Sequence, residues 1–555
     1  MKLGSLAAIL IYLCATFNPT IAQWDYHDYS SLSKRLKQIE QNNQKLCKLT
    51  SIGKSAGGKD IWMLKISNGE DTKPSILVVA GADGHHRAGV EIALGLLEDR
   101  LKKTELLDKC NFYFIPGLSP DALIPIGAKI ITKGTNDNAM DDDRDGFADE
   151  DPIEDLNMDG LITWIRVAHP AGDYTEDTKD PRLMVKLKSE TTDKQRYLLY
   201  QEGIDNDNDN KFNEDSRGGV NINMNFAFDY PFGKAGAGYY AASEPETRAL
   251  MDFLATHQEI FAVLHLGPSD NLVEPPTYQK QQGESRIITS VTETDALVYK
   301  SISEEYKNQV GHSRKIAEAP GAGSLSQTLY FHAGRWSFVS PGWVPIPKNI
   351  TKDSLDNKLT ERSVPLNYNK TGRIDNKINY DENLLKWADE NNEELAFIPW
   401  HPIDHPNFPN NKVEVGGVNT AFHLNPPSIF LDSAIIKHNA FLTKIASLCP
   451  QLQLGNEKLE KLDEGLFRIT IEFFNTGLFP TNTEIADKLK INSKLKVKVN
   501  TGNNQKLLSG NKVTFLKAMQ SGERKEMSWL VSGSGECKIE IGSETTNKIV
   551  KKFNL

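Results

Sequence analysis

Residues 76–93 read ILVVAGADGHHRAGVEIA, and this stretch decides the fold. It opens with an unbroken apolar run from Ile76 to Ala80, passes through a glycine-containing loop, and continues into a helical pattern from Val90 to Lys102. A short apolar run without alternation is typical of a strand that is buried on both faces of a parallel sheet. The stretch therefore predicts a strand, a loop and a helix, with the polar side chains of the loop beyond the end of the strand.

The same alternation of strands and helices continues on both sides of this stretch. We expect an amphipathic helix over residues 24–46, strands over Phe112–Ile115 and Ile260–Leu266, and a helix over Glu244–His257. Strands that alternate with helices predict an α/β domain with a mixed, largely parallel sheet flanked by helices. We assign this domain to residues 23–455 and place an acidic insertion at about 134–218.

The pattern changes after about Asn456, where short β-type runs follow one another between turns rich in glycine, asparagine and serine. Such spacing is typical of a small all-β sandwich, which we assign to residues 456–555. The predicted strands are Leu466–Phe474, Lys494–Val499, Lys512–Phe515, Glu526–Val531 and Glu536–Ile541.

The composition of the 555 residues is that of a globular protein, with 39% hydrophobic and 25% charged residues. The chain is long enough for at least two domains and a sizeable core. Its formal net charge of −10 disfavours nucleic acid or an anionic membrane as a partner.

The first 22 residues have the organisation of a signal peptide. Lys2 supplies the positive charge, Leu6 to Ala15 form the apolar region, and residues 20–22 form a cleavage site before Gln23. A membrane anchor is the alternative, but the apolar run is too short to span a bilayer, and no later segment is long enough. We therefore expect a secreted or periplasmic protein without a transmembrane segment after cleavage.

Export would leave four cysteines in the mature chain, Cys47, Cys110, Cys449 and Cys537. An even number in an oxidising compartment permits two disulfides, and the sequence leaves all three pairings open.

Three loops carry acidic or amide side chains at alternate positions, and glycine follows in two of them. Calcium takes six to eight oxygen ligands, and glycine permits the sharp turn that lets them converge. The loops therefore predict calcium, with a solvated acidic loop as the alternative. The predicted ligands are Asp141, Asp143, Asp145, Asp149, Asp155, Asn157, Asp159, Asp205, Asp207 and Asp209.

Several further motifs follow residues 76–93 in a fixed order along the chain. They are Ser119-Pro120-Asp121, residues 220–226 (VNINMNF), 243–249 (SEPETRA), 263–265 (VLH), 412–417 (KVEVGG) and 475–481 (NTGLFPT). In order and spacing these motifs resemble the M14 zinc carboxypeptidases. The acidic loops and the β-sandwich tail are similar to a bacterial branch of that family. The resemblance covers about residues 24–540.

The resemblance implies a catalytic zinc site of two histidines and one glutamate, with an open position for water. In this chain the aligned positions hold Asp83, His86 and His265, because Asp83 stands in the position of the family's first histidine and His86 in that of its glutamate. The permuted set still contains two imidazoles and one carboxylate, which is the ligand chemistry of a catalytic zinc. His85 is a substitute ligand, and a metal-free pocket is the alternative.

Further site residues follow from the same resemblance. Glu414 is the expected general base, which would take a proton from the metal-bound water and return it; a surface carboxylate is the alternative. Asn223 and Met224 lie in the substrate-binding segment, where Met224 replaces the family's carboxylate-binding arginine. Tyr330 and Arg335, in a cluster with His332 and Trp336, are candidate pocket-wall residues or ordinary packing. Arg144 and Arg166 are both candidates for the second active-site arginine.

The resemblance implies a secreted metallocarboxypeptidase that hydrolyses peptide bonds in a peptide or protein substrate with a zinc-activated water. Two alternatives stay open. One is an inactive pseudo-peptidase that binds peptide or cell-wall material, and the other is an amidase on the same fold.

Overall fold

The computed structural model describes residues 25–69, 73–125, 133–141, 154–187, 194–206, 212, 219–311, 315, 317–348, 378–491 and 494–555. The predicted signal peptide lies outside these ranges. Within them, no helix is both long enough and apolar enough to cross a membrane.

The central sheet has six strands in the order β1-β2-β4-β3-β9-β10. Strands β4, β3, β9 and β10 run parallel, and the hairpin β1–β2 joins them in the antiparallel direction. The strands are β1 (Cys47–Lys54), β2 (Asp60–Ile66), β3 (Ser75–Ala80), β4 (Asn111–Ile115), β9 (Ile260–Leu266) and β10 (Trp336–Ser340). The three strands predicted from apolar runs are thus confirmed as β3, β4 and β9.

Helices cover both faces of this sheet, which is why β3, β4, β9 and β10 are buried at every position. One face packs against α1 (Tyr29–Asn42), α2 (Arg87–Lys102), α5 (Glu293–Val310) and α9 (Leu431–Ser447). The other packs against α3 (Pro245–Thr256) and α6 (Leu325–Phe331).

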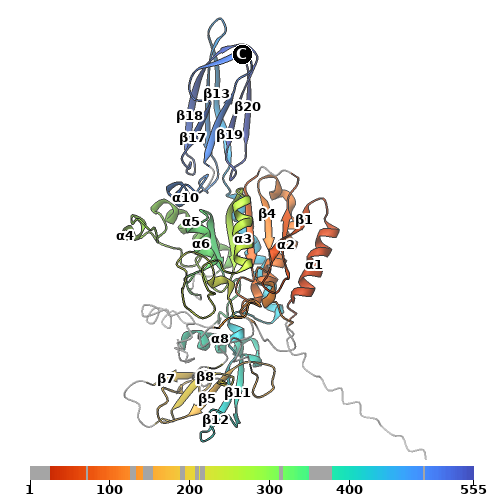
Figure 1. The fold of residues 1–555 in the computed structure, drawn as a ribbon, viewed down its shortest axis with the longest axis vertical. Coiled ribbons are helices and arrows are strands. Elements are labelled where there is room, and N and C mark those ends of the chain that lie inside the picture. The colour runs from red at the N-terminus through yellow and green to blue at the C-terminus, as the bar shows by residue number, and fades with distance from the viewer. Residues whose placement is uncertain are drawn as a thin grey trace, which may run out of the picture.

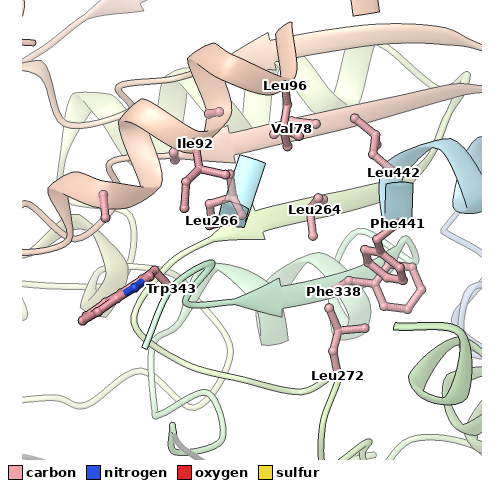
Figure 2. Packing of buried hydrophobic residues seen from close by; sticks show 14 of the residues in the cluster. Val78, Ile92, Leu96, Leu264, Leu266, Leu272, Phe338, Trp343, Phe441 and Leu442 are labelled. Carbon is pink, nitrogen blue, oxygen red and sulfur yellow. The ribbon is translucent and has the colours of Figure 1, made fainter. Parts of the chain in front are cut away.

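Figure 2 shows the first of these faces from close by. Val78, Leu264 and Phe338 come from three adjacent strands and form one apolar surface. Ile92 and Leu96 of α2 and Phe441 and Leu442 of α9 close over it.

The first helix is shorter than the expected 24–46. It begins at Tyr29 because the Asp28 carboxylate caps it, accepting a hydrogen bond of 2.8 Å from the Ser31 amide. It ends at Asn42, and the chain turns into β1 at Cys47.

A second six-stranded sheet, which the sequence did not predict, has the order β11-β12-β5-β8-β6-β7 and is antiparallel throughout. Four of its strands come from the region expected as an acidic insertion, and the other two come from residues 397–418. Its strands are β5 (Trp164–Ala168), β6 (Tyr174–Glu176), β7 (Met184–Lys186), β8 (Tyr197–Gln201), β11 (Phe397–Ile403) and β12 (Val413–Val418).

The C-terminal part forms two four-stranded antiparallel sheets, β13-β14-β18-β16 and β17-β15-β19-β20, around their own apolar core. All five predicted strands are present. The strands are β13 (Leu452–Asp463), β14 (Leu466–Asn475), β15 (Leu495–Asn500), β16 (Gln505–Ser509), β17 (Val513–Leu516), β18 (Arg524–Gly533), β19 (Glu536–Gly542) and β20 (Ile549–Asn554).

The molecule is elongated, with the central sheet between the other two parts (Figure 1). The C-terminal sheets extend from one end of it and the second sheet lies at the opposite end. The remaining helices are α4 (Lys280–Gly283), α8 (Ile378–Asn391) and α10 (Glu484–Leu489). The predicted fold class, a mixed, mostly parallel sheet with helices plus a C-terminal all-β part, is confirmed.

Candidate functional site

The loop between β3 and α2 contains the first two predicted zinc ligands. His86 directly precedes α2 and is 1% exposed. Its Nε2 lies 2.9 Å from the carbonyl oxygen of Pro341, which fixes the ring in the hydrogen-bonding network of the protein. Its Nδ1 lies near the Leu266 carbonyl but makes no well-formed hydrogen bond. Burial lowers the pKa of His86, which favours the neutral ring.

Asp83 lies at the start of the same loop and serves as a hydrogen-bond acceptor within the protein. Its Oδ1 accepts a 3.0 Å hydrogen bond from the amide of His85. Its Oδ2 accepts a 3.1 Å hydrogen bond from the side-chain amide of Asn221. Both carboxylate oxygens are therefore used to shape the loop.

His265 lies near the carboxyl end of β9, opposite Val79 of β3 and Val339 of β10. It is 1% exposed, and neither ring nitrogen has a hydrogen-bond partner. Burial lowers the pKa of His265 to about 3, and the nearby His86 contributes to the shift. A buried imidazole without partners is energetically costly, so His265 is the strongest sign in this region of a missing interaction.

These observations test whether the chain fits a catalytic zinc, which needs three protein ligands and an open position. The unpartnered nitrogens of His265 suit a metal. However, no three His, Cys, Asp or Glu side chains in the described part of the chain lie close enough together to hold one. The structure thus does not bring Asp83, His86 and His265 together as such a group. Both carboxylate oxygens of Asp83 and Nε2 of His86 are hydrogen-bonded within the protein, whereas Nδ1 of His86 makes no well-formed hydrogen bond. His85, the substitute ligand, is exposed and is not part of such a group either.

Glu414, the predicted general base, lies on β12 of the second sheet, whereas His265 lies on β9 of the central sheet. Its Oε2 is 2.8 Å from Nε of Arg166, its partner on β5, and its Oε1 is 2.8 Å from Nζ of Lys412. Burial alone would raise the pKa of Glu414, but the hydrogen bond from Lys412 and the charge of Arg166 outweigh it and lower the pKa. A carboxylate so well paired is a weak base, and the catalytic role of Glu414 stays a prediction.

Arg166 also makes several contacts with other side chains of the second sheet. Its Nη1 lies 2.8 Å from Oε1 of Glu176, and the guanidinium stacks between the rings of Tyr197 and Trp400 at 4.8 and 4.5 Å. Arg166 is therefore bound to the candidate base itself, and the other candidate, Arg144, lies outside the described residues.

The predicted substrate-binding segment lies close to Asp83. Asn223 donates its amide to the carbonyl of Ala82, and its side-chain oxygen accepts from the amide of Leu325. Met224 follows in the same short turn and is half-buried. The segment is therefore beside the β3–α2 loop, but it presents no cation that could bind a terminal carboxylate.

For Tyr330 and Arg335 the sequence left open a pocket wall or ordinary packing, and their described contacts are those of packing. Tyr330 is buried and donates a 2.7 Å hydrogen bond to Asp295, and burial raises its pKa. Arg335 precedes β10, whereas His265 pairs with Val339. Four residues of strand, roughly 13 Å, separate Arg335 from Val339. Arg335 therefore lies at the amino end of the parallel strands, and His265 lies near their carboxyl end.

The described parts of the acidic loops lend no support to calcium. Asp155 accepts hydrogen bonds from the amides of Asp159 and Gly160, and Asp159 accepts one from the amide of Leu161. These oxygens, with Asn157, shape their own loop, and no metal-binding group occurs among the described residues. Asp141 and Asp205 are described, and neither belongs to a metal-binding group of the described residues. The other predicted ligands lie outside the described residues; they are Asp143, Asp145, Asp149, Asp207 and Asp209.

Asn425, which no sequence pattern indicated, holds the β3–α2 loop in place. Its side-chain oxygen accepts from the amides of Arg87 and Ala88, and its side-chain nitrogen donates to the carbonyl of His85. The contact joins residues about 340 positions apart, which no local pattern could indicate.

Two family profiles match separate parts of the chain. The profile of the zinc carboxypeptidase family matches residues 32–126 and 188–358, and that of a domain of unknown function matches residues 451–554. Human carboxypeptidase D is 34% identical over 122 residues, which are 20% of this chain and 9% of that protein. A zinc carboxypeptidase of Saccharothrix mutabilis is 26% identical over 108 residues, 18% of this chain and 25% of that protein. The chain thus spans a small part of these relatives.

Among solved structures, bovine thrombin-activatable fibrinolysis inhibitor in complex with tick carboxypeptidase inhibitor has 12% identity and a TM-score of 0.39, over 76% of this chain and 96% of that one. A metallo-carboxypeptidase from Burkholderia cenocepacia has 12% identity and a TM-score of 0.32, over 57% and 60%. The fold assignment rests on the strand order and on the profile match. The profile and the sequence relatives place residues 32–126 and 188–358 of the chain in the M14 zinc carboxypeptidase family.

Proposed function

We propose that this chain is a non-catalytic member of its family, which binds peptides without hydrolysing them. The observation that carries the proposal is the use of Asp83 and His86 as internal hydrogen-bond partners at the two positions where the family pattern has metal ligands. Without a third ligand beside His265, the water-activating step of the family has no site in the described residues.

The pairing of Glu414 supports the same conclusion independently. A proton-transfer group must reach the reacting water, and its pKa should lie near the working pH. Glu414 instead bonds two cations in another sheet, and these interactions lower its pKa.

The peptide is the ligand class that family membership suggests, and the segment around Asn223 and Met224 is the proposed contact. Methionine cannot form the bidentate ion pair that an arginine makes with a carboxylate. We therefore expect the chain to bind peptides with free and amidated C-termini equally well.

A binding and hydrolysis assay on the full chain tests the proposal. Dye-labelled short peptides, free or amidated at the C-terminus, are titrated by fluorescence anisotropy with zinc or with chelator, and the products are analysed by mass spectrometry. We expect binding that is unaffected by chelator, and no cleavage. The variant Met224→Arg should bind the free peptides about tenfold more tightly, since a charged hydrogen bond contributes about 1.5–3 kcal/mol. The amidated peptides serve as its control.

Metal-dependent peptide hydrolysis is the second candidate, and the unpartnered nitrogens of His265 favour it. In that case cleavage would occur with zinc, and His265→Ala would abolish both cleavage and metal binding. That result would overturn the proposal, as would the absence of any peptide binding.

A further inference from the structure

The four cysteines in the described part of the chain are all buried thiols in this structure. Cys47 lies in β1, Cys110 precedes β4, Cys449 follows α9, and Cys537 lies in β19. The sequence left three pairings open, and the structure distinguishes between them.

The side chain of Cys449 reaches the peptide bond that precedes Cys110, although the two cysteines are 339 positions apart. The sulfur of Cys449 is 3.9 Å from the carbonyl oxygen of Lys109, which belongs to the peptide bond that joins Lys109 to Cys110. The side-chain nitrogen of Gln451 lies 3.5 Å from that same oxygen and 3.5 Å from the Cys449 sulfur. Both cysteines are 0% exposed and belong to the same apolar core. The proximity also affects titration: after burial, the Cys449 thiolate is the next largest cause that raises the pKa of Cys110.

Distance excludes a bond between Cys47 and Cys110 and any bond of Cys537 to a cysteine of the central sheet. Cys47 pairs with Ile66 in β2, and Ile66 pairs with Phe112 in β4. Two strand spacings, roughly 9.6 Å, therefore separate Cys47 from β4, whereas a disulfide needs Cα atoms within about 7 Å. Cys537 lies in the separate core of the C-terminal sheets, so it cannot reach any cysteine of the central sheet.

We propose that Cys110 and Cys449 form an intrachain disulfide when the chain folds in the presence of a disulfide oxidant such as oxidised glutathione, whereas Cys47 and Cys537 remain thiols. One cysteine attacks the oxidant and forms a mixed disulfide, releasing one glutathione thiol. The second cysteine then attacks the protein sulfur of that mixed disulfide and releases the second glutathione. The two protein thiols lose two protons and two electrons, and one glutathione disulfide becomes two thiols.

The timing follows from burial. Burial raises the pKa of Cys110 and raises that of Cys449 to about 11, so the reactive thiolate is scarce in the folded state. Oxidation therefore takes place during folding, before the core closes over the pair.

The bond would stabilise the junction between the central domain and the C-terminal sheets. Cys449 lies two residues before Gln451, whose carbonyl accepts from the Thr476 amide, and the amide of Phe479 donates to the carbonyl of Leu448. A Cβ on Gly477 would lie 2.1 Å from the Cys449 carbonyl oxygen, so this loop packs directly on the cysteine.

The experiment uses the full chain with Cys14→Ser, which leaves the four described cysteines. The protein is refolded with oxidised glutathione or with a reductant, and thiols are counted after denaturation. We expect two thiols after oxidation and four after reduction. Peptide mapping should show one reducible link, between the peptides that contain Cys110 and Cys449. The oxidised form should melt about 5–10 °C higher, because the bond closes a very long loop in the unfolded chain.

Matched variants complete the test. Cys47→Ser and Cys537→Ser should still lose two thiols on oxidation and keep the shift in melting temperature. Cys110→Ser and Cys449→Ser should lose no thiols on oxidation, and their melting temperature should not rise. Four thiols in the refolded, oxidised chain would overturn the proposal, as would a link that contains Cys47 or Cys537. Peptide mapping of the Cys14→Ser chain decides the question even where a further serine variant does not fold.

Discussion

His265 and Glu414 lie in two regions that differ in whether their buried polar atoms have partners. His265, at the carboxyl end of β9, is buried with both ring nitrogens unpartnered. Glu414, on β12, is half of an ion pair with Arg166 and also bonds Lys412, so both of its oxygens are satisfied. In the family pattern these two residues act on the same water, yet here they lie in different sheets.

A buried polar group can be stabilised by a partner in the protein, or it can lack such a partner. The burial of Glu414 and of Arg166 is explained by their ion pair, since a buried charge is tolerated when it is paired and hydrogen-bonded. His265 has no such explanation within the protein, which is consistent with a family position that has lost its function. The predictions below either break this contrast or make it quantitative.

The largest effect is expected from Arg166→Met. Arg166 and Glu414 are 8% and 10% exposed, and removal of Arg166 leaves the buried Glu414 with the exposed Lys412 as its cation. We expect the free energy of unfolding to fall by about 3–5 kcal/mol, measured by chemical denaturation. The double variant with Glu414→Gln should lose much less than the sum of the single variants. A loss below about 1 kcal/mol would show that the cluster does not hold the second sheet together.

The pH dependence of stability should reveal His265 in the metal-free protein. Its pKa is about 3 when folded and about 6.5 when unfolded, so the unfolded chain binds more protons between these values. Stability from this group is thus complete above pH 6.5 and falls as the pH decreases toward 3. The loss amounts to about 3 kcal/mol at pH 4.5. His265→Leu should remove this dependence, and identical pH profiles would contradict the account.

At pH 8, His265→Leu should stabilise the protein by about 1 kcal/mol, because it removes buried polar atoms without partners. His438→Leu is the matched control. His438 is also buried, but its nitrogens lie 3.0 Å from Oγ of Ser340 and 2.9 Å from the carbonyl of Ala434. Its replacement should destabilise by about 1–2 kcal/mol. Thermal unfolding of both variants measures the difference in sign.

The smallest effect is expected from Lys412→Met. Lys412 is 66% exposed, and ion pairs at the surface contribute little to stability. We expect an unchanged midpoint of denaturation, with Arg166 still bonded to Glu414. A large shift would mean that Lys412, and not Arg166, is the main partner of Glu414.

Much of the fold could be predicted from the sequence because its signals are local. The apolar runs that became β3, β4 and β9 are continuous, and the strands after Asn456 alternate in a regular way. The second sheet could not be predicted, because β5 pairs with β12, about 250 positions away, and β6 and β7 have only three residues each.

The candidate site could be predicted only in part, for the same reason. The order of the motifs indicated a substrate-binding segment at Asn223 and Met224, and the structure places the amide of Asn223 on the carbonyl of Ala82, beside the loop of Asp83. It could not indicate that Pro341 binds His86 or that Arg166 binds Glu414, because these contacts depend on how distant segments pack.

Zinc affinity tests the central claim most directly. The metal-free full chain is titrated with zinc against a competing chelator, in parallel with His265→Ala and with Asp83→His/His86→Glu, which restores the family's ligand types. We predict that the wild-type chain and His265→Ala bind zinc equally weakly, and that the double substitution raises the affinity. Tight binding of one zinc per wild-type chain, lost in His265→Ala, would contradict the account and restore the metal-dependent hydrolase.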